Sequence, residues 1–456
     1  MKTFDNIIIG FGKGGKTLGG ALSGAGQSVA LVEQSSRMYG GTCINVACIP
    51  TKSLENSARQ SAAQGGNYEE KAKRYAQAVS EKNRLTAMLR QKNYDKAVSA
   101  GVNVLDGKAY FLDDHRIAVE KEDGTTQELY GERIFINTGS RPFIPPIKGL
   151  DGNPYVYTSE SLMERDSLPR RLVIIGGGYI GLEFASYFNN FGSEVTVLQD
   201  GDDFIPREDR EVAEAVLENM VSRGIRILRG AATKEIREMD GAAVIAVDLK
   251  DGARELEADA VLVATGRRPN VKELHLDAAG VELTQRGAVR VDEKLRTSVP
   301  HIWAMGDVAG GLQFTYISLD DFRIVKDQLL GKGERTTENR GEVPYTVFLD
   351  PPLSRAGLSE EEARKKGYDV KIAKLPAVLV PKAQVLKKTA GLLKAVVDAG
   401  TGKVLGAHFF CADSHEMINL VKLAMDAGLP YTVLRDGIFT HPTMSEALND
   451  LFSNLK

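Results

Sequence analysis

The sequence predicts an α/β fold with two Rossmann-like dinucleotide-binding domains and a C-terminal α+β domain. A buried-strand pattern followed by GxGxxG and a helix pattern occurs twice, at residues 6–15 and 172–181. From about Val343 the character changes: a turn-rich Asp350-Pro-Pro stretch precedes strand patterns at 370–377 and 391–397 and a helix pattern at 414–427. At 456 residues the chain is also too long for one hydrophobic core, so two to four domains are expected.

The composition is that of an ordinary globular protein and excludes several function classes. Hydrophobic residues make up 43% and charged residues 26%, and the net charge of −3 predicts no nucleic-acid partner. No apolar run approaches the roughly 18 residues that span a bilayer, so no membrane association is expected. The N-terminus does not resemble a secretory signal, and three cysteines are too few for a disulfide framework. We therefore expect a cytoplasmic protein.

The first glycine motif follows a strand at residues 6–9. Gly10 allows the tight turn, Gly12 lets the backbone approach a pyrophosphate, and Gly15 lets helix and strand pack closely. The phosphates would sit on the helix N-terminus. The next strand, 28–32, ends at Glu33, about 20 residues on, where an acid binds a ribose hydroxyl. The alternative for Glu33 is a solvated strand end.

The second motif has the same layout, with strand 172–175 leading into Gly176, Gly178 and Gly181. Its following strand, 194–198, ends at Gln199 and Asp200. Two nucleotides are therefore expected to bind, and they need not be of the same kind.

Three further strand ends fit two dinucleotide domains. Strands at 134–137 and 261–264 each end in Thr-Gly, at Thr138-Gly139 and Thr265-Gly266. A third strand, from residue 301, ends at Gly306-Asp307, where an acid suits a hydroxyl-rich part of a cofactor. Between the motifs, residues 68–102 predict long amphipathic helices with a solvated charged face.

Cys43 and Cys48 are the candidate redox-active residues. Five positions apart on a regular helix, their Cα atoms would lie roughly 7.5 Å apart along the axis, and a disulfide needs less than about 7 Å. The turn holding Cys43 is therefore expected to be distorted, or to lie partly outside the helix. Gly40 and Gly41 before it, and Pro50, which a first helical turn accepts, are consistent with this. A helix N-terminus would favour the reactive thiolate. Two buried unreacted cysteines are the alternative; a metal site is disfavoured because no further Cys or His follows at ligand spacing.

Cys411 and His441 are the other candidate functional residues. Cys411 has no close partner in the sequence, so a buried structural role is expected. His441 lies five residues before Glu446, which could hold its imidazole in one tautomer for general acid catalysis. On its own, His441 would be an ordinary surface or core histidine.

These motifs occur in one order: GGTCxNxxCxPTK, the paired GxGxxG, ATGRRPN, the Gly306-Asp307 strand and HPTxSE. Together, over essentially the whole chain, they resemble the FAD-dependent pyridine nucleotide–disulfide oxidoreductases, which include glutathione reductase, lipoamide dehydrogenase and mercuric reductase. The resemblance implies FAD-binding segments at 1–145 and 271–340, an NAD(P)H-binding domain at 146–270 and a dimerisation domain at 341–456.

The resemblance also implies a role for each motif residue. FAD contacts are implied at Gly10, Gly12, Gly15, Glu33, Gly41, Thr42, Lys52, Thr138, Gly139 and Asp307. NADH or NADPH contacts are implied at Gly176, Gly178, Tyr179, Ile180, Gly181, Gln199 and Gly266, with Tyr179 as a gate over the nicotinamide pocket.

The same resemblance implies a separate catalytic role for each of six residues. Cys48 would face the flavin, Cys43 would attack the substrate, and Lys52 would pair with Glu183 beside the flavin N5. His441 and Glu446 would act on the partner subunit's disulfide, which makes a homodimer necessary for activity. No resident metal is implied.

A narrower resemblance concerns substrate. Stretches such as MYGGTCIN and GLPYTVLRDGIFTHPTMSEALNDLF are similar to bacterial reactive-chlorine-resistance flavoproteins, a group linked to hypothiocyanous acid and copper(II) reduction. This implies a small-molecule oxidant as substrate and a role in oxidative-stress defence. The alternatives are a reductase of the lipoamide dehydrogenase type and a low-turnover flavin redox sensor.

Some positions depart from the family pattern. Ala47 stands where many relatives carry Gly, and Pro352-Leu353 replaces a common Pro-Glu; neither has a functional account. Gln199 replaces the acid usual for NADH, yet no arginine follows closely to grip a 2′-phosphate, so NADH and NADPH both stay open. The absence of a C-terminal cysteine pair counts against mercuric reductase.

Overall fold

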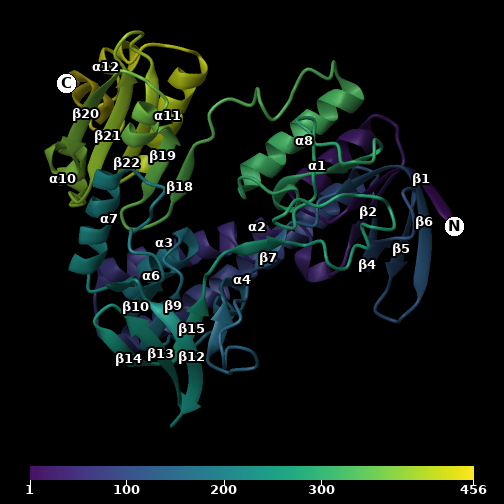
Figure 1. The fold of residues 1–456 in the computed structure, drawn as a ribbon, viewed down its shortest axis with the longest axis horizontal. Coiled ribbons are helices and arrows are strands. Elements are labelled where there is room, and N and C mark those ends of the chain that lie inside the picture. The colour runs from purple at the N-terminus through teal and green to yellow at the C-terminus, as the bar shows by residue number, and fades with distance from the viewer. The chain divides into compact units, whose positions relative to one another are not determined.

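The computed structural model describes residues 1–456, and the chain divides into two compact units (Figure 1). Unit 1 consists of Met1–Ser53, Gln77–Phe143 and Gly266–Arg340. Unit 2 consists of Leu54–Ala76, Ile144–Thr265 and Gly341–Lys456.

A seven-stranded sheet lies at the centre of unit 1, in the order β3-β2-β1-β6-β5-β4, with β17 also paired to β6. Its strands are β1 (Lys2–Ile9), β2 (Val29–Glu33), β3 (Asn103–Asp106), β4 (Lys108–Phe111), β5 (Arg116–Glu120), β6 (Thr126–Ile136) and β17 (Ile302–Ala304). The strands β3, β2, β1, β6 and β17 are parallel, whereas β5 and β4 add an antiparallel edge.

The run of isoleucines in β1 shows why this sheet is buried on both faces. Ile7 and Ile9 pack in one core cluster, whereas Ile8 packs in another with Phe11 and Leu18. Because successive side chains point to opposite faces of a strand, a strand covered on both sides has a continuous apolar sequence.

Helices α1 (Lys13–Gly24) and α8 (Thr315–Leu330) pack against each other in unit 1 (Figure 1). Its short elements are η1 (Ser36–Met38), α2 (Thr42–Asn45), β7 (Ser140–Pro142), β16 (Arg267–Pro269) and η2 (Gly306–Ala309), with β7 and β16 antiparallel. Two long helices, α3 (Cys48–Gln64) and α4 (Tyr68–Ser99), contribute residues to both units. Glu69 and Glu70 in the first turn of α4 and Lys96 in its last turn match the helix dipole.

Unit 2 contains the second parallel sheet, in the order β11-β10-β9-β15-β8. Its strands are β8 (Val156–Thr158), β9 (Arg171–Ile175), β10 (Glu194–Gln199), β11 (Arg226–Arg229) and β15 (Ala260–Val263). Its helices are α5 (Ser159–Leu162), α6 (Tyr179–Phe191) and α7 (Arg210–Ser222). A separate antiparallel sheet consists of β12 (Ala232–Met239), β13 (Ala242–Leu249) and β14 (Gly252–Ala258).

The C-terminal part of unit 2 is an antiparallel sheet with helices, in the order β18-β19-β22-β21-β20. Its strands are β18 (Tyr345–Val347), β19 (Leu353–Gly357), β20 (Val370–Pro376), β21 (Leu392–Asp398) and β22 (Val404–Phe410). Its helices are α9 (Glu360–Lys365), η3 (Ala377–Leu379), α10 (Pro381–Leu386), α11 (Ser414–Asp426), α12 (Thr432–Arg435) and α13 (Ala447–Ser453). Cys411 is buried in the core of this part, as its expected structural role requires.

A buried lysine joins the two parts of unit 2. Lys394 of β21 is 3% exposed, and its Nζ lies 2.9 Å from Asp209 and 2.6 Å from Glu211, at the start of α7. Glu360 of α9 completes the group at 2.8 Å. Burial opposes the charge on Lys394, but the three hydrogen-bonded carboxylates together raise its pKa to about 12.

None of the helices combines the length and the apolar character that crossing a bilayer needs.

Candidate active site

The first glycine turn joins β1 to α1 and is closed by backbone atoms. Gly10 has φ +103°, and a Cβ atom there would overlap the Asn137 carbonyl oxygen. A Cβ on Gly15 would lie 2.7 Å from the Gly10 carbonyl oxygen. Helix α1 begins after Gly12 without a side-chain cap. Two amides of its first turn are already engaged, those of Gly14 with Ser318 and of Gly15 with Asn137. The positive end of the helix dipole and the close glycine backbone still fit this turn to a dinucleotide pyrophosphate.

Glu33 lies at the end of β2, beside that turn, and is only 7% exposed. Its Oε2 accepts a hydrogen bond from the Phe11 amide at 3.0 Å, and its Oε1 accepts one from the Ser35 amide at 3.3 Å. Burial raises the pKa of the Glu33 carboxyl to about 7, although these amides oppose the rise. The burial rules out the solvated strand end and fits an acceptor for a ribose hydroxyl.

The first glycine turn, Glu33 and the segment after β17 together form what we call the first dinucleotide cradle. No sequence motif marks Asn137, yet its side chain joins two parts of this cradle. Its Oδ1 accepts a hydrogen bond from the Gly15 amide at 2.8 Å, and its Nδ2 donates to the Met305 carbonyl at 2.7 Å. The buried amide therefore holds the glycine turn against the segment that follows β17.

The segment after β17 places Asp307 beside β7. The Ser140 hydroxyl donates to the Asp307 carboxylate at 2.6 Å. Thr138 and Gly139 both bond to Asn270: the Thr138 hydroxyl donates to its carbonyl at 2.7 Å, and its amide donates to the Gly139 carbonyl at 3.0 Å. The expected cofactor residues on β6, β7 and η2 therefore lie within one unit.

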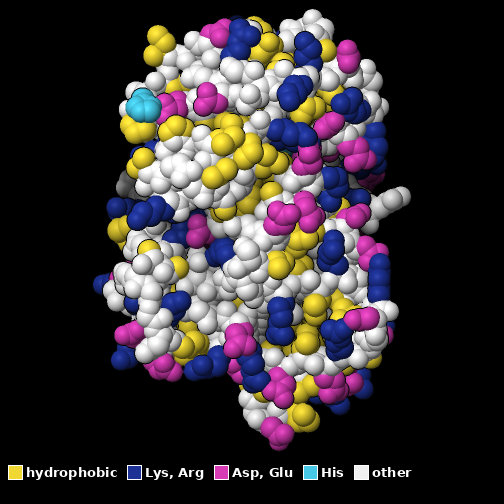
Figure 2. All heavy atoms as spheres, turned by 90° about the vertical axis from the view of Figure 1, so that its left-hand side faces the viewer, with side chains coloured by type: hydrophobic (Ala, Val, Ile, Leu, Met, Phe, Trp, Pro, Cys, Tyr) yellow, Lys and Arg dark blue, Asp and Glu magenta, His cyan; other side chains and the backbone are white.

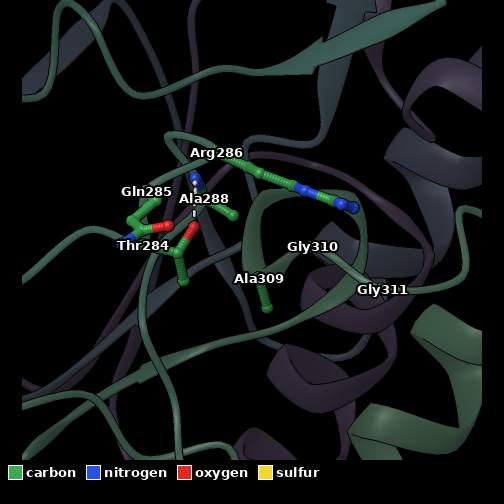
Figure 3. Close-up of a pocket in the computed structure, with 7 residues that line it drawn as sticks. All are labelled: Thr284, Gln285, Arg286, Ala288, Ala309, Gly310 and Gly311. Atoms are coloured by element: carbon green, nitrogen blue, oxygen red, sulfur yellow. Dashed lines mark hydrogen bonds between the residues drawn. The ribbon is translucent and has the colours of Figure 1, made fainter.

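A pocket of about 380 Å³ opens next to the Asp307 turn. Figure 3 shows its lining, with the Arg286 side chain extending beside Gly310. The Thr284 hydroxyl accepts a hydrogen bond from the Ala288 amide at 3.2 Å, which closes the loop on one side. None of the predicted site residues lines this pocket, so we do not assign it to the active site.

Cys43 and Cys48 lie on separate helices. α2 contains Cys43, α3 begins at Cys48, and the intervening Val46 has φ −139°. This break confirms the expected distortion. No disulfide joins the two thiols in the structure, and Cys48 is the neighbour with the largest effect on the pKa of Cys43. The Cys48 sulfur also lies 3.4 Å from the Thr315 hydroxyl, at the start of α8.

The two thiols have different electrostatic surroundings. The hydrogen bond with Cys48, followed by burial, raises the pKa of the Cys43 thiol above its usual range. Cys48 is the first residue of a 17-residue helix, where the aligned peptide dipoles favour a thiolate. Cys43 therefore needs a base to remove its proton before it can attack a substrate.

Close backbone contact packs the cysteine loop against the first glycine turn. Gly41 has φ +81°, and a Cβ there would lie 2.7 Å from the Gly12 Cα. Lys16, which no motif marks, donates from its Nζ to the Gly40 carbonyl at 3.2 Å and to Asn93 at 2.6 Å. Burial lowers the pKa of Lys16 to about 8.

Two further predicted residues, Thr42 and Lys52, lie close to the cysteine loop. The Thr42 hydroxyl lies 3.6 Å from the position of a Cβ on Gly139, which places α2 against the end of β6. Lys52 follows Cys48 by four residues on α3, one helical turn on.

The second glycine turn, in unit 2, repeats the first with one difference. A Cβ on Gly176 would overlap the Ala264 carbonyl oxygen, and a Cβ on Gly181 would overlap the Gly176 carbonyl oxygen. A Cβ on Gly178, however, would meet no protein atom within 4 Å. Helix α6 has no side-chain cap, so the amides of its first turn, including that of Ile180, can bind a pyrophosphate.

Gln199 ends β10 beside this second turn and presents a buried acceptor. Its Nε2 donates to the carbonyls of Gly201 at 3.1 Å and Asp203 at 2.6 Å, which fixes the orientation of the amide. Its buried Oε1 has no hydrogen-bond partner in the chain. A ribose hydroxyl could donate to this oxygen, whereas a phosphate could not.

Tyr179, the first residue of α6, is tied to a buried acid that sequence patterns did not mark. Its hydroxyl donates to the Glu208 carboxylate, and the Tyr345 hydroxyl donates to the same oxygen at 2.7 Å. The Glu208 side chain is fully buried, with an Arg355 nitrogen 4.0 Å away. Burial, then the Glu208 charge, raises the pKa of Tyr179 above its usual range, so its phenol keeps its proton.

Glu183 and the His441–Glu446 pair also belong to unit 2. The Glu183 carboxylate accepts a hydrogen bond from the Phe348 amide at 2.8 Å. The Nδ1 of His441 lies 2.8 Å from the Glu446 carboxylate, and the His441 side chain is 72% exposed. This contact matches the predicted pairing and leaves Nε2 for proton transfer.

The predicted residues thus form two groups. Unit 1 contains the two thiols, Lys52, the expected FAD residues and also Gly266, whose carbonyl accepts from the Phe143 amide. Unit 2 contains the second glycine turn, Tyr179, Gln199, Glu183 and the His441–Glu446 pair. The pairing of Lys52 with Glu183, and the approach of His441 to a disulfide, stay predictions.

Family models match nearly the whole chain. Residues 4–321 match the model described as pyridine nucleotide-disulphide oxidoreductase, and residues 343–452 match the dimerisation domain of that family. The chain therefore belongs to the pyridine nucleotide-disulphide oxidoreductases. It is a flavoprotein enzyme that uses FAD and NAD(P)H, as the sequence predicts.

Among individual proteins, the pyridine nucleotide-disulfide oxidoreductase RclA of Escherichia coli (strain K12) is 48% identical over 457 residues, covering 100% of both chains. The solved structure of the HOCl-induced flavoprotein disulfide reductase RclA from Escherichia coli matches with a TM-score of 0.92 over 99% of each chain. Its Cu(II) complex matches with a TM-score of 0.94, also at 48% identity over 99% of each chain.

Mercuric reductase from Staphylococcus aureus is more distant, at 34% identity over 98% of this chain and 81% of that protein. Dihydrolipoyl dehydrogenase from Bacillus subtilis is 30% identical over 97% of this chain and 94% of that protein.

Proposed function

We propose that this enzyme passes electrons from NAD(P)H to a small oxidant through the Cys43–Cys48 pair, and that hypothiocyanous acid is its main substrate. The observation that carries the proposal is the break between α2, which contains Cys43, and α3, which begins at Cys48, packed against the first glycine turn in unit 1. The similarity to a HOCl-induced flavoprotein disulfide reductase supports an oxidant produced under chlorine stress.

The residues of the chain fit the cofactors. Gly10, Gly12, Gly15, Gly41 and Glu33 would hold FAD, with Thr42, Thr138, Gly139 and Asp307 along the same cradle. Gly176, Gly178, Ile180, Gly181 and Gln199 would hold the nicotinamide nucleotide. Bound FAD supplies the two electrons that reduce the Cys43–Cys48 disulfide.

The different surroundings of the Cys43 and Cys48 thiols then determine the order of the thiol reactions. A base removes the proton from Cys43, and the thiolate attacks the sulfur of hypothiocyanous acid. This gives a Cys43 sulfenyl thiocyanate and releases hydroxide, which a proton converts to water. The Cys48 thiolate attacks the Cys43 sulfur, forms the disulfide and releases thiocyanate. Two electrons pass from the dithiol to the oxidant in each cycle.

The base is proposed to be His441 of the partner subunit, oriented by Glu446. The raised pKa of Cys43 creates the need for a base, and the exposure of His441 allows it to serve another chain. A homodimer is supported by the dimerisation-domain match at residues 343–452. Figure 2 shows hydrophobic side chains gathered over this domain. The exposed hydrophobic residues of its sequence include Leu423, Leu429, Val433 and Ile438.

Gln199 supports NADH as the preferred nucleotide. Its amide nitrogen is occupied by two backbone carbonyls, so only the partnerless acceptor Oε1 is left for the ligand. The 2′-hydroxyl of NADH can donate to it, whereas the 2′-phosphate of NADPH would place acceptor against acceptor.

Steady-state oxidation of NADH and NADPH by the purified holoenzyme tests these proposals. Hypothiocyanous acid, copper(II), lipoamide and glutathione disulfide would be offered in parallel. Fast turnover with hypothiocyanous acid and NADH is expected. Preference for lipoamide would move the protein to the dehydrogenase type, and reduction in a single turnover without recycling would indicate a redox sensor.

A further inference from the structure

A cluster of two histidines and an acid lies in unit 1, apart from every residue assigned above. Asp114 and His115 lie in the turn between β4 and β5, and His301 directly precedes β17. Each of the three offers one ligand atom, and these atoms all lie within 4.8 Å of one another.

We propose that Asp114, His115 and His301 form a binding site for a divalent transition cation of the Zn²⁺ type. Two imidazoles and one carboxylate are a ligand set that such ions accept, with water in the remaining position.

A backbone hydrogen bond holds His115 in a form suited to coordination. His115 Nδ1 lies 2.8 Å from the Gly131 carbonyl, so Nδ1 carries the hydrogen and Nε2 keeps its lone pair. This is the contact that orients most metal-binding histidines. On the other side, His301 Nε2 donates to the Asp114 carbonyl at 2.9 Å and lies 3.9 Å from its carboxylate. A cation bound through this nitrogen replaces that hydrogen bond and moves the imidazole proton to Nδ1.

The two rings are close enough to serve one ion. Their centroids lie 3.9 Å apart with an interplanar angle of 3°. Ligand atoms on a tetrahedral zinc, with bonds of about 2.1 Å, lie about 3.4 Å from one another. Because imidazole lone pairs lie in the ring plane, coordination requires the two parallel rings to rotate until their lone pairs converge and the ligand atoms to close by about 1.5 Å.

The local charge also favours a cation. Arg116 is engaged by Asp113, which accepts from its Nε at 2.6 Å, so the carboxylate of Asp114 is left for a metal. Asp114 is exposed, which gives an ion direct access from solvent.

Zn²⁺ titration of the FAD-loaded full chain tests the site, with Cys43→Ser and Cys48→Ser combined so that the thiols cannot bind the probe. We expect one equivalent of Zn²⁺ per chain with a micromolar dissociation constant. His301→Ala and His115→Ala should each weaken binding at least tenfold. The matched control, His275→Ala, changes an exposed histidine of the same unit outside the cluster and should leave binding unchanged.

A second variant and a second readout keep the test independent of folding. Asp114→Asn removes a ligand charge at an exposed position and should weaken Zn²⁺ several-fold without loss of bound FAD. Co²⁺ in place of Zn²⁺ should give a visible absorption band that His301→Ala abolishes. Unchanged Zn²⁺ affinity in His115→Ala and His301→Ala, or no micromolar binding by the Cys43→Ser/Cys48→Ser reference, would overturn the proposal.

Discussion

The phenol of Tyr179 donates a hydrogen bond to the fully buried carboxylate of Glu208. Tyr345 donates to the same oxygen, so two phenols share one acceptor in unit 2. Tyr179 is the proposed gate over the nicotinamide pocket, and this contact holds its ring in place.

Replacing Glu208 by Gln should therefore make the gate easier to move. Loss of the charge weakens the phenol hydrogen bond by roughly 1 kcal/mol, which corresponds to about a fivefold lower KM for NADH. Tyr345→Phe keeps the Tyr179–Glu208 bond and should change KM less than about twofold. Equal KM values for wild type and Glu208→Gln would show that this contact does not control nucleotide entry.

The two glycines of the second turn should respond differently to alanine. Gly181→Ala drives a Cβ into the Gly176 carbonyl oxygen and should destabilise unit 2 by about 3 kcal/mol or more. Gly178→Ala meets no protein atom, so its denaturation midpoint should stay near wild type while NADH binding weakens at least tenfold. Denaturant unfolding with NADH titration separates the effects; a destabilised Gly178→Ala would contradict the assignment.

Glu33 should make the stability of the FAD-free protein depend on pH. Its folded pKa of about 7 lies above the ordinary 4.5, so the folded state binds more protons between these values and loses stability as pH rises through them. Charging this buried group costs roughly 3 kcal/mol by pH 8, from about 1.4 kcal/mol for each pKa unit. The unfolding free energy of Glu33→Gln minus that of wild type should therefore rise by roughly 3 kcal/mol between pH 4.5 and pH 8. A pH-independent difference in unfolding free energy would refute the buried-carboxyl account.

Lys394 should contribute far more to the stability of the fold than its neighbour Lys374. Lys394→Met leaves the buried Asp209 carboxylate without its cation and should cost about 3–5 kcal/mol of unfolding free energy. Lys374, 45% exposed in its ion pair with Glu211, is the matched control; Lys374→Met should cost less than about 1 kcal/mol. Similar losses in the two variants would mean that burial does not set the strength of this group.

The glycine turns, the cysteine pair, Glu33 and the family could be predicted from the sequence because each has a local pattern. The break between the helices of Cys43 and Cys48 followed from geometry alone. Asn137, Lys16, Thr315 and Glu208 could not be predicted in the same way. Their partners lie 24 to 267 residues away, and single polar residues carry no periodic signal. The His115–His301 stack likewise depends on sheet topology that brings β17 beside β6.

The most direct test of the central claim compares wild type with Cys43→Ser in NADH oxidation driven by hypothiocyanous acid. The account predicts rapid turnover by wild type with release of thiocyanate. The variant should retain bound FAD that NADH still reduces, but its turnover should fall at least a hundredfold. Turnover by Cys43→Ser at the wild-type rate would show that electrons reach the oxidant without the dithiol and would contradict the mechanism.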